Sequence, residues 1–188
     1  DFNPGIANST FNSFALFNGA IYFSLGPVNA ELWKTNGTVA GTTLVKQMAA
    51  NVNYTSYDDT FIVNGTTLFF EGNDTTNGRE PWKSDGTTAG TVLLKNVNTA
   101  TGGSAESSPQ FRHTIGGLTL FSAYDSSYVR SLWVTDGTIA GTVMLKDINA
   151  GAPPSGVIAS NSTVLDSKLL FRATTASDGD ELWVTDGT

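Results

Sequence analysis

The sequence predicts an all-β protein built from four tandem units of about 50 residues each. The only four tryptophans of the 188 residues follow one another at intervals of 49, 51 and 50 residues. A lysine lies 13 residues after each of the first three tryptophans. No segment keeps a helical spacing of apolar residues for more than about two turns. The tryptophans are Trp33, Trp82, Trp133 and Trp183.

The units divide the chain at approximate positions 1–48, 49–98, 99–149 and 150–188. In the first three units, the segment around the tryptophan continues into an Ala-Gly-Thr sequence. The fourth unit reaches Thr188 before this continuation. We therefore expect one array of units, with an incomplete last unit, that is a segment of a longer array.

Each unit is expected to hold four short strands, which in the second unit are residues 60–63, 67–70, 80–84 and 92–95. Asn64-Gly65 predicts a hairpin between the first two strands, because both residue types tolerate a positive φ. A turn is expected between the last two, in which an Asp side chain accepts backbone hydrogen bonds and a Gly adopts the left-handed conformation. Asn36 replaces the Asp in the first unit. The structural residues of these turns are Asp85, Asp136, Asp186, Gly37, Gly86, Gly137 and Gly187.

Continuous apolar runs predict how the sheets pack. Ile21-Tyr22-Phe23, Leu68-Phe69-Phe70 and Leu169-Leu170-Phe171 do not alternate with polar residues. A strand that is apolar on both sides belongs to a sheet that is covered on both faces. Four strands per unit, with each sheet between two neighbours, predict a β-propeller-like array in which every tryptophan fills the gap between adjacent blades. The alternative is a β-solenoid, whose turns usually take about 20 to 30 residues.

The repeated motif resembles that of a known family. Glu181-Leu182-Trp183-Val184-Thr185-Asp186-Gly187-Thr188 and its three counterparts are similar to the repeat of the ELWxxDGT family. The resemblance covers almost the whole chain and departs from the pattern at Asn36, Pro81 and Ser131. It implies a propeller-like repeat protein of secreted or surface-attached microbial origin, and it transfers no catalytic residue.

Composition excludes several classes of function. The net charge is −7, with 10 Lys and Arg against 17 Asp and Glu, which argues against nucleic-acid partners. No stretch approaches the ~18 apolar residues that predict a membrane span, so membrane insertion is not expected. The absence of Cys excludes thiol nucleophiles and Cys–zinc sites, and the single His113 leaves little for a His-based centre.

Two arginines and two tyrosines are the candidate ligand-binding residues. Arg79 and Arg130 each lie three residues before a tryptophan, so they occupy equivalent positions of two blades. Tyr124 and Tyr128 fall in a variable segment between strands, where exposed rings could stack on a sugar. The competing interpretation is that the arginines are solvated loop cations and that the rings pack the loops. No catalytic residue is predicted.

Oxygen ligands in loops give weaker candidates for other sites. Asp178, Asp180 and Glu181 are candidate calcium ligands, although their spacing is not that of a complete calcium loop. No cofactor is otherwise expected. Six Asn-x-Ser/Thr sequons are candidate glycosylation sites, namely Asn8, Asn36, Asn53, Asn64, Asn73 and Asn161.

These observations predict a non-catalytic, extracellular or cell-surface repeat protein with a structural or adhesive role. It is expected to be part of a larger surface or fibre assembly, built with neighbouring copies or further repeats of the same protein. A glycan-binding propeller is the alternative, and a glycoside hydrolase is a third reading that lacks an identified site. The expected partners are other repeats of the same protein, or glycans.

Overall fold

The computed structural model describes residues 10–26, 29–50, 61–100, 106–146, 148, 157–175 and 177–188. Their fifteen strands form four sheets, and all strand pairs are antiparallel. The prediction of an all-β chain is confirmed. A search of these residues finds no helix that could cross a membrane.

Each sheet is a meander, because every strand pairs with the next strand along the chain. The first sheet holds β1 (Thr10–Phe17), β2 (Ala20–Gly26), β3 (Asn29–Thr35) and β4 (Thr43–Ala50). The second holds β5 (Ile62–Asn64), β6 (Thr67–Asp74), β7 (Gly78–Ser84) and β8 (Val92–Leu93). The third holds β9 (Gln110–Ile115), β10 (Leu118–Tyr124), β11 (Arg130–Thr135) and β12 (Val143–Lys146). The fourth has three strands, β13 (Val157–Leu165), β14 (Lys168–Thr175) and β15 (Gly179–Thr185).

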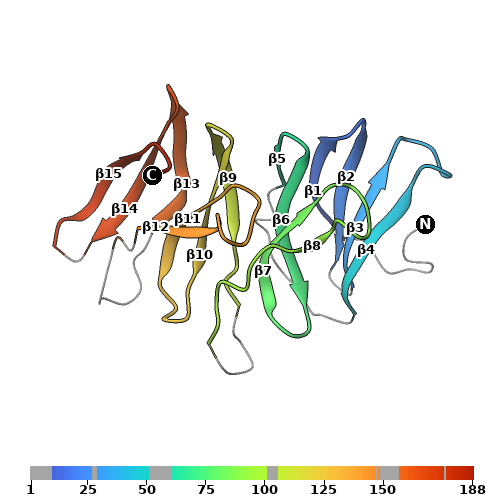
Figure 1. Cartoon of the computed structure of the whole chain (residues 1–188), viewed down its shortest axis with the longest axis horizontal. Helices are drawn as coiled ribbons and strands as arrows, with labels where there is room; N and C mark the ends of the chain where they lie inside the picture. Colours follow the sequence, from blue (N-terminus) through green and yellow to red (C-terminus); the bar gives the residue numbers. More distant parts are fainter. Residues whose placement is uncertain are drawn as a thin grey trace.

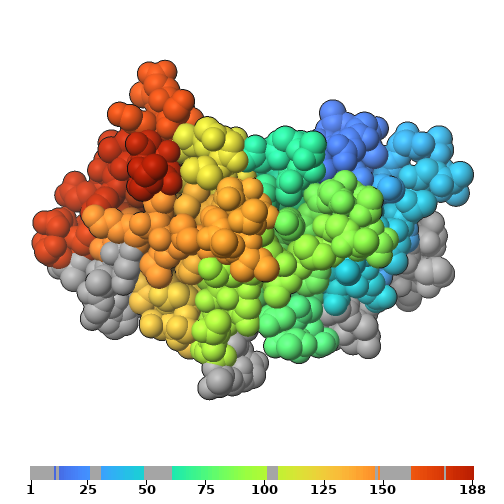
Figure 2. All heavy atoms as spheres, in the orientation of Figure 1, coloured from blue at the N-terminus to red at the C-terminus, as the bar shows by residue number. Residues whose placement is uncertain are grey.

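The four sheets stand side by side in chain order (Figure 1), with the first sheet at one end of the row and the fourth at the other. The space-filling view shows the same order, from blue and cyan at one end to red at the other (Figure 2). Antiparallel sheets that follow one another as blades exclude the β-solenoid alternative, in which parallel strands would stack from one turn to the next.

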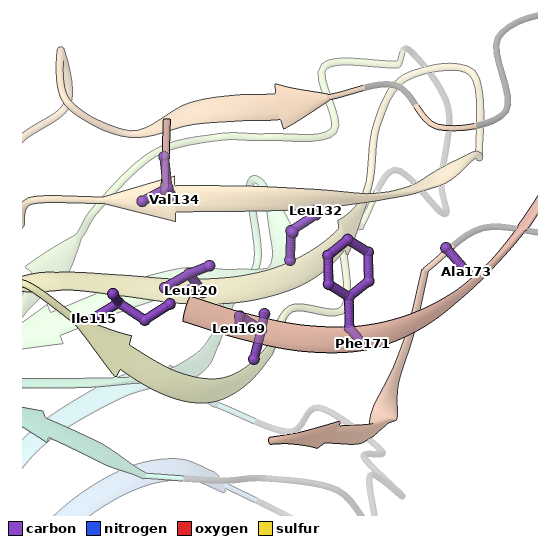
Figure 3. Close-up of a cluster of buried hydrophobic side chains, with 7 residues drawn as sticks. All are labelled: Ile115, Leu120, Leu132, Val134, Leu169, Phe171 and Ala173. Carbon is purple, nitrogen blue, oxygen red and sulfur yellow. The ribbon is translucent and has the colours of Figure 1, made fainter. Parts of the chain in front are cut away.

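Three buried clusters fill the spaces between successive sheets. The cluster between the first and second sheets is Phe17, Tyr22, Leu32, Val45, Leu68, Phe70 and Trp82. The cluster between the second and third is Phe69, Leu94, Val97, Phe111, Phe121, Ala123 and Trp133. The cluster between the third and fourth is Ile115, Leu120, Leu132, Val134, Leu169, Phe171 and Ala173, whose side chains point toward one another from both sheets (Figure 3).

The continuous apolar runs supply both faces of a sheet. Leu68 and Phe70 on β6 belong to the cluster against the first sheet, whereas Phe69 belongs to the cluster against the third. Successive side chains of a strand point to opposite faces, so a strand in the middle of the row must be apolar at every position. In the second, third and fourth sheets the tryptophan packs against the cluster shared with the preceding sheet, as Trp82, Trp133 and Trp183 do.

The second unit differs in detail from the predicted strands. The first hairpin turn is Gly65–Thr66, one residue later than predicted, because Asn64 pairs with Thr67 as the last residue of β5. The third sheet has the same two-residue connection, with Ile115 paired to Leu118, and in the second sheet the Asn64 Nδ2 also donates to Gly117 O of the third sheet at 2.7 Å. β8 is shorter than predicted and ends at Leu93, and the predicted strand start at Thr60 lies outside the described residues.

Candidate functional site

The turn after the tryptophan strand is a closed network of hydrogen bonds. In the second sheet, Asp85 Oδ1 accepts from the backbone N of Thr87 at 2.8 Å and from its Oγ1 at 2.7 Å. Thr87 Oγ1 in turn accepts from Gly90 N at 2.9 Å, and Thr91 Oγ1 donates to Thr87 O at 2.6 Å. The turns at Asn36 and Asp136 contain the same four bonds. The motif therefore serves the fold locally, because each polar side chain bonds to the backbone of its own turn.

Glycine is required at two positions of this turn, for a different physical reason at each. Gly86 has φ +92°, in the left-handed region that an L side chain rarely adopts. Gly90 has no positive φ, but a Cβ at this position would lie 2.1 Å from the Asp85 carboxylate. The equivalent Gly41 and Gly141 are constrained in the same way by Asn36 and Asp136.

The lysine that follows each tryptophan by 13 residues reaches into the next sheet. Lys95 Nζ donates to Thr142 O at 2.6 Å and lies 5.9 Å from the centre of the Trp133 ring. Lys146 Nζ lies 5.4 Å from the centre of the Trp183 ring. Lys46 Nζ lies 3.5 Å from Thr88 O of the second sheet. The constant spacing from tryptophan to lysine therefore connects one sheet with the turn or the indole of the next.

Arg130 and Tyr124, two of the candidate ligand-binding residues, contact each other. The Arg130 guanidinium lies 4.2 Å from the centre of the Tyr124 ring, in a cation–π arrangement. It also donates to Ser122 Oγ at 2.9 Å and to Ser108 O at 3.1 Å. Tyr128 lies beyond this pair in the turn before β11, with half of its surface exposed and a φ of +57°.

Arg79, the other candidate arginine, makes an ion pair with Glu106 that includes a 2.7 Å bond from Nε to Oε2. Its backbone carbonyl accepts from Ser107 N at 2.8 Å. Because Ser108 O accepts from Arg130, residues 106–108 link the two arginines. The structure thus brings Arg79 and Arg130 to the same boundary between the second and third sheets, each engaged with protein groups.

Two buried carboxyl groups lie at this boundary, and the sequence reasoning missed both. Burial raises the pKa of Glu71 to about 8, against an opposing effect of the positive charges of Arg79 and Arg130. Glu71 Oε1 is buried and has no hydrogen-bond partner among the described residues. A signal for Glu71 was present, since it directly follows the apolar run that ends at Phe70.

Glu80 is the second buried carboxyl group and is fully enclosed. Burial raises its pKa to about 7, although four hydrogen bonds to the carboxylate act in the opposite direction. Its oxygens accept from Val97 N and Ser107 Oγ, both at 2.8 Å. Glu80 therefore ties the segment between the second and third sheets to β7, which is a structural use of the carboxylate.

The candidate calcium ligands already have protein partners. Asp180 accepts from Arg172 and Thr174, and Asp178 accepts from Ser177 Oγ at 2.6 Å. These hydrogen bonds hold the pKa of both carboxyl groups below the usual range. Glu181 is exposed on β15. Over the described ranges, no three His, Cys, Asp or Glu side chains are grouped so that they could hold a metal ion.

The sequons fall in different settings. Asn8 and Asn53 lie outside the described residues, and Asn161 lies on β13. Asn73 pairs with Arg79 in the second sheet. Asn36 accepts hydrogen bonds within its turn, and the amide nitrogen of Asn64 donates to the next sheet.

One small cavity lies between the third and fourth sheets. Its volume is about 10 Å³, room for about one water molecule, and its lining includes His113, Ser162 and Phe171. His113 Nε2 and Ser162 Oγ are 2.8 Å apart, and burial lowers the pKa of the imidazole. A cavity of this size cannot admit an organic substrate.

Comparison with known proteins supports the fold alone. No protein-family model and no curated protein matches the chain. Among solved structures, TolB from Acinetobacter baumannii is similar with a TM-score of 0.54 and 11% identity, over 95% of this chain and 41% of the TolB chain. This chain therefore spans about two fifths of the length of TolB. The prediction of a β-propeller-like array is confirmed for the fold, that is, for the arrangement of antiparallel sheets as successive blades.

Two further similar structures have TM-scores below 0.5. The computationally designed Ika4 protein has a TM-score of 0.49 and 14% identity, over 96% of this chain and 93% of Ika4. The GH43_1 enzyme from Xanthomonas citri complexed with xylose has a TM-score of 0.38 and 12% identity, over 95% of this chain and 70% of the enzyme.

Proposed function

We propose that the protein is a non-catalytic repeat scaffold of the ELWxxDGT type, with a structural or adhesive role in an extracellular or cell-surface assembly. The observation that carries this proposal is that several charged side chains contact the neighbouring sheet or the segment that leads to it. Lys95 and Lys146 contact the following sheet, and the Arg79–Glu106 pair holds the segment that leads to the third sheet. These groups stabilise the row of sheets instead of surrounding a substrate cavity.

The surface chemistry agrees with an exposed setting. The chain carries 17 acidic and 10 basic residues, and it has no Cys that would depend on the redox state of its surroundings. Its turns are built from Thr, Asp and Gly bonded to their own backbone, as in the Asp85 and Asp136 turns. Repeats that each contact only their neighbours form a long surface whose stability accumulates along the row.

The experiment that tests this role is surface labelling of the organism that makes the protein. Antibodies raised against the purified chain are applied to intact cells, and a cytoplasmic protein serves as the control for leakage. We expect labelling of intact cells at the level seen after permeabilisation. Labelling that requires permeabilisation would contradict the extracellular role. Turnover of glycosides or esters by the purified chain, lost on Glu71→Gln, would contradict the non-catalytic role.

Glycan binding is the second candidate, and Tyr128 favours it. Its side chain is half exposed in the turn two residues before Arg130, whose guanidinium packs on the Tyr124 ring, and an exposed aromatic ring can stack on a sugar. A glycan array tests it, with Tyr128→Ala as the variant and Val39→Ala, an exposed change in a distant turn, as the control. Binding by the wild type and by Val39→Ala that is lost in Tyr128→Ala would support a lectin-like site, and an array without signal would remove it.

A further inference from the structure

Among the residues that the structure describes, the two end sheets of the row each expose an apolar face. On the fourth sheet this is the tail face, defined by Leu165, Leu170, Leu182 and Val184. Leu165 is 58% exposed, Leu182 74% and Val184 59%. Large apolar side chains at this level of exposure, gathered on one sheet face, indicate an interaction surface.

The third sheet shows what covers such a face. By strand register and spacing from the tryptophan, the tail face corresponds to Ile115, Leu120, Leu132 and Val134. Those four side chains are at most 4% exposed, because Leu169, Phe171 and Ala173 of the fourth sheet pack on them (Figure 3). The same pattern of apolar residues is thus buried inside the row and exposed at its end.

The opposite end of the row carries the complementary face. The head face of the first sheet is defined by Phe14, Ile21, Trp33 and Leu44. Phe14 is 60% exposed and Leu44 43%. Its counterparts in the second sheet are Phe61, Leu68, Trp82 and Leu93, all of which belong to or pack against the cluster that joins the second sheet to the first.

We propose that the head face of one copy of this chain packs on the tail face of a second copy, by the same contacts that join successive sheets within the chain. The inference rests on the proposed structural role and names its partner. The argument for a second copy is that the four apolar positions that define each free face match one side of the internal interfaces, although the tail face also carries Arg172 where the third sheet has Ser122. The contact is head-to-tail, so each copy in a pair retains one free face, and association continues until a ring closes or a filament grows.

Sedimentation velocity of the purified 188-residue chain over a wide range of concentrations tests the proposal. We expect the wild type to associate as its concentration rises. Leu182→Glu on the tail face and Phe14→Glu on the head face should each weaken association by at least about tenfold, because each places a carboxylate in an apolar contact. Ile139→Glu is the matched control: Ile139 is 69% exposed in a turn outside both faces, so this variant should associate like the wild type.

Mixing the two variants tests whether the contact is head-to-tail. Phe14→Glu keeps a working tail face and Leu182→Glu keeps a working head face, so together they should form a dimer that grows no further. Circular dichroism of each variant, measured beforehand, checks that it is folded. A folded wild type that stays monomeric at every concentration, or variants that do not pair when mixed, would overturn the proposal.

The outcomes also separate this inference from the proposed function. A monomeric chain on a protein that labels intact cells would remove the head-to-tail contact and leave the surface role standing. Association of the purified chain, combined with labelling that requires permeabilisation, would support the head-to-tail contact and remove the surface role.

Discussion

Lys95 of the second sheet lies against Trp133 of the third, with its Nζ 5.9 Å from the centre of the indole and 2.6 Å from Thr142 O. The tryptophan repeat and the lysine repeat of the sequence are therefore two halves of one contact between sheets. Lys146 Nζ lies in the same way over the Trp183 ring, 5.4 Å from its centre, one sheet further along.

Replacing Lys95 should weaken the boundary between the second and third sheets. Lys95→Met keeps the aliphatic stem but loses the hydrogen bond to Thr142 O and the attraction to the indole, so we expect a loss of about 1–2 kcal/mol in the free energy of unfolding. Urea denaturation measures it. Lys168→Met, at an exposed position of β14, is the control and should change the value by less than about 0.5 kcal/mol. Equal losses in the two variants would contradict the contact.

The position of a tryptophan in the row should decide how much it contributes. Trp133 is 7% exposed and packs between two sheets, so Trp133→Ala should cost about 3–5 kcal/mol. Trp33 lies half-buried on the head face of the first sheet, so Trp33→Ala should cost clearly less. Chemical denaturation followed by circular dichroism compares the two variants. A larger loss for Trp33→Ala would contradict the packing described here.

Gly141 should be required in its turn because the Asp136 side chain leaves no room for a Cβ atom, and not because of its φ angle. The added Cβ of Gly141→Ala would lie 2.1 Å from the Asp136 carboxylate, and displacing that side chain breaks its bonds to Thr138. We expect a cost of about 2–3 kcal/mol. In an Asp136→Ala background the same change should cost much less, since the obstructing side chain is gone. A double-mutant cycle with no coupling would refute this explanation.

Glu71 should make the protein less stable as the pH rises through neutrality. Its pKa of about 8 in the folded chain lies above the ordinary value of 4.5, so at intermediate pH the folded chain keeps a proton that the unfolded chain has released. The free energy of unfolding then falls with rising pH, by up to about 1.4 kcal/mol per pH unit for one such group. The contribution is fully present below pH 4.5 and is lost by about pH 8.

Glu71→Gln should flatten that decline and stabilise the chain at pH 8, because the amide stays neutral in the buried site. Glu80, with a pKa of about 7, contributes a slope of the same sign, so part of the decline should remain. Urea midpoints measured from pH 5 to about pH 9 test this. Glu181→Gln, an exposed change, should leave the slope as it is. A slope that Glu71→Gln does not alter would show that Glu71 does not titrate as described.

The sequence by itself determined the strands, their turns and the row of sheets. These features depend on short-range chemistry: the bonds of the Asp85 turn join residues at most seven apart, and alternating side chains place Leu68 and Phe69 on opposite faces. Because the sequence repeats with a nearly constant length, Trp82 and Trp133 occupy equivalent positions, and each unit forms the same strands and turns. The differences from the predicted strands of the second unit are local: the first hairpin turn lies one residue later, at Gly65–Thr66, and β8 ends at Leu93.

The tertiary structure alone decided which charged residues meet. Arg79 and Glu106 are 27 positions apart, and Lys95 and Thr142 are 47 apart, in different units. Glu71 becomes unusual only because the neighbouring sheet removes its carboxyl group from water and raises its pKa. Contacts and burial of this kind depend on how one sheet is set against the next, which no local pattern of residues encodes.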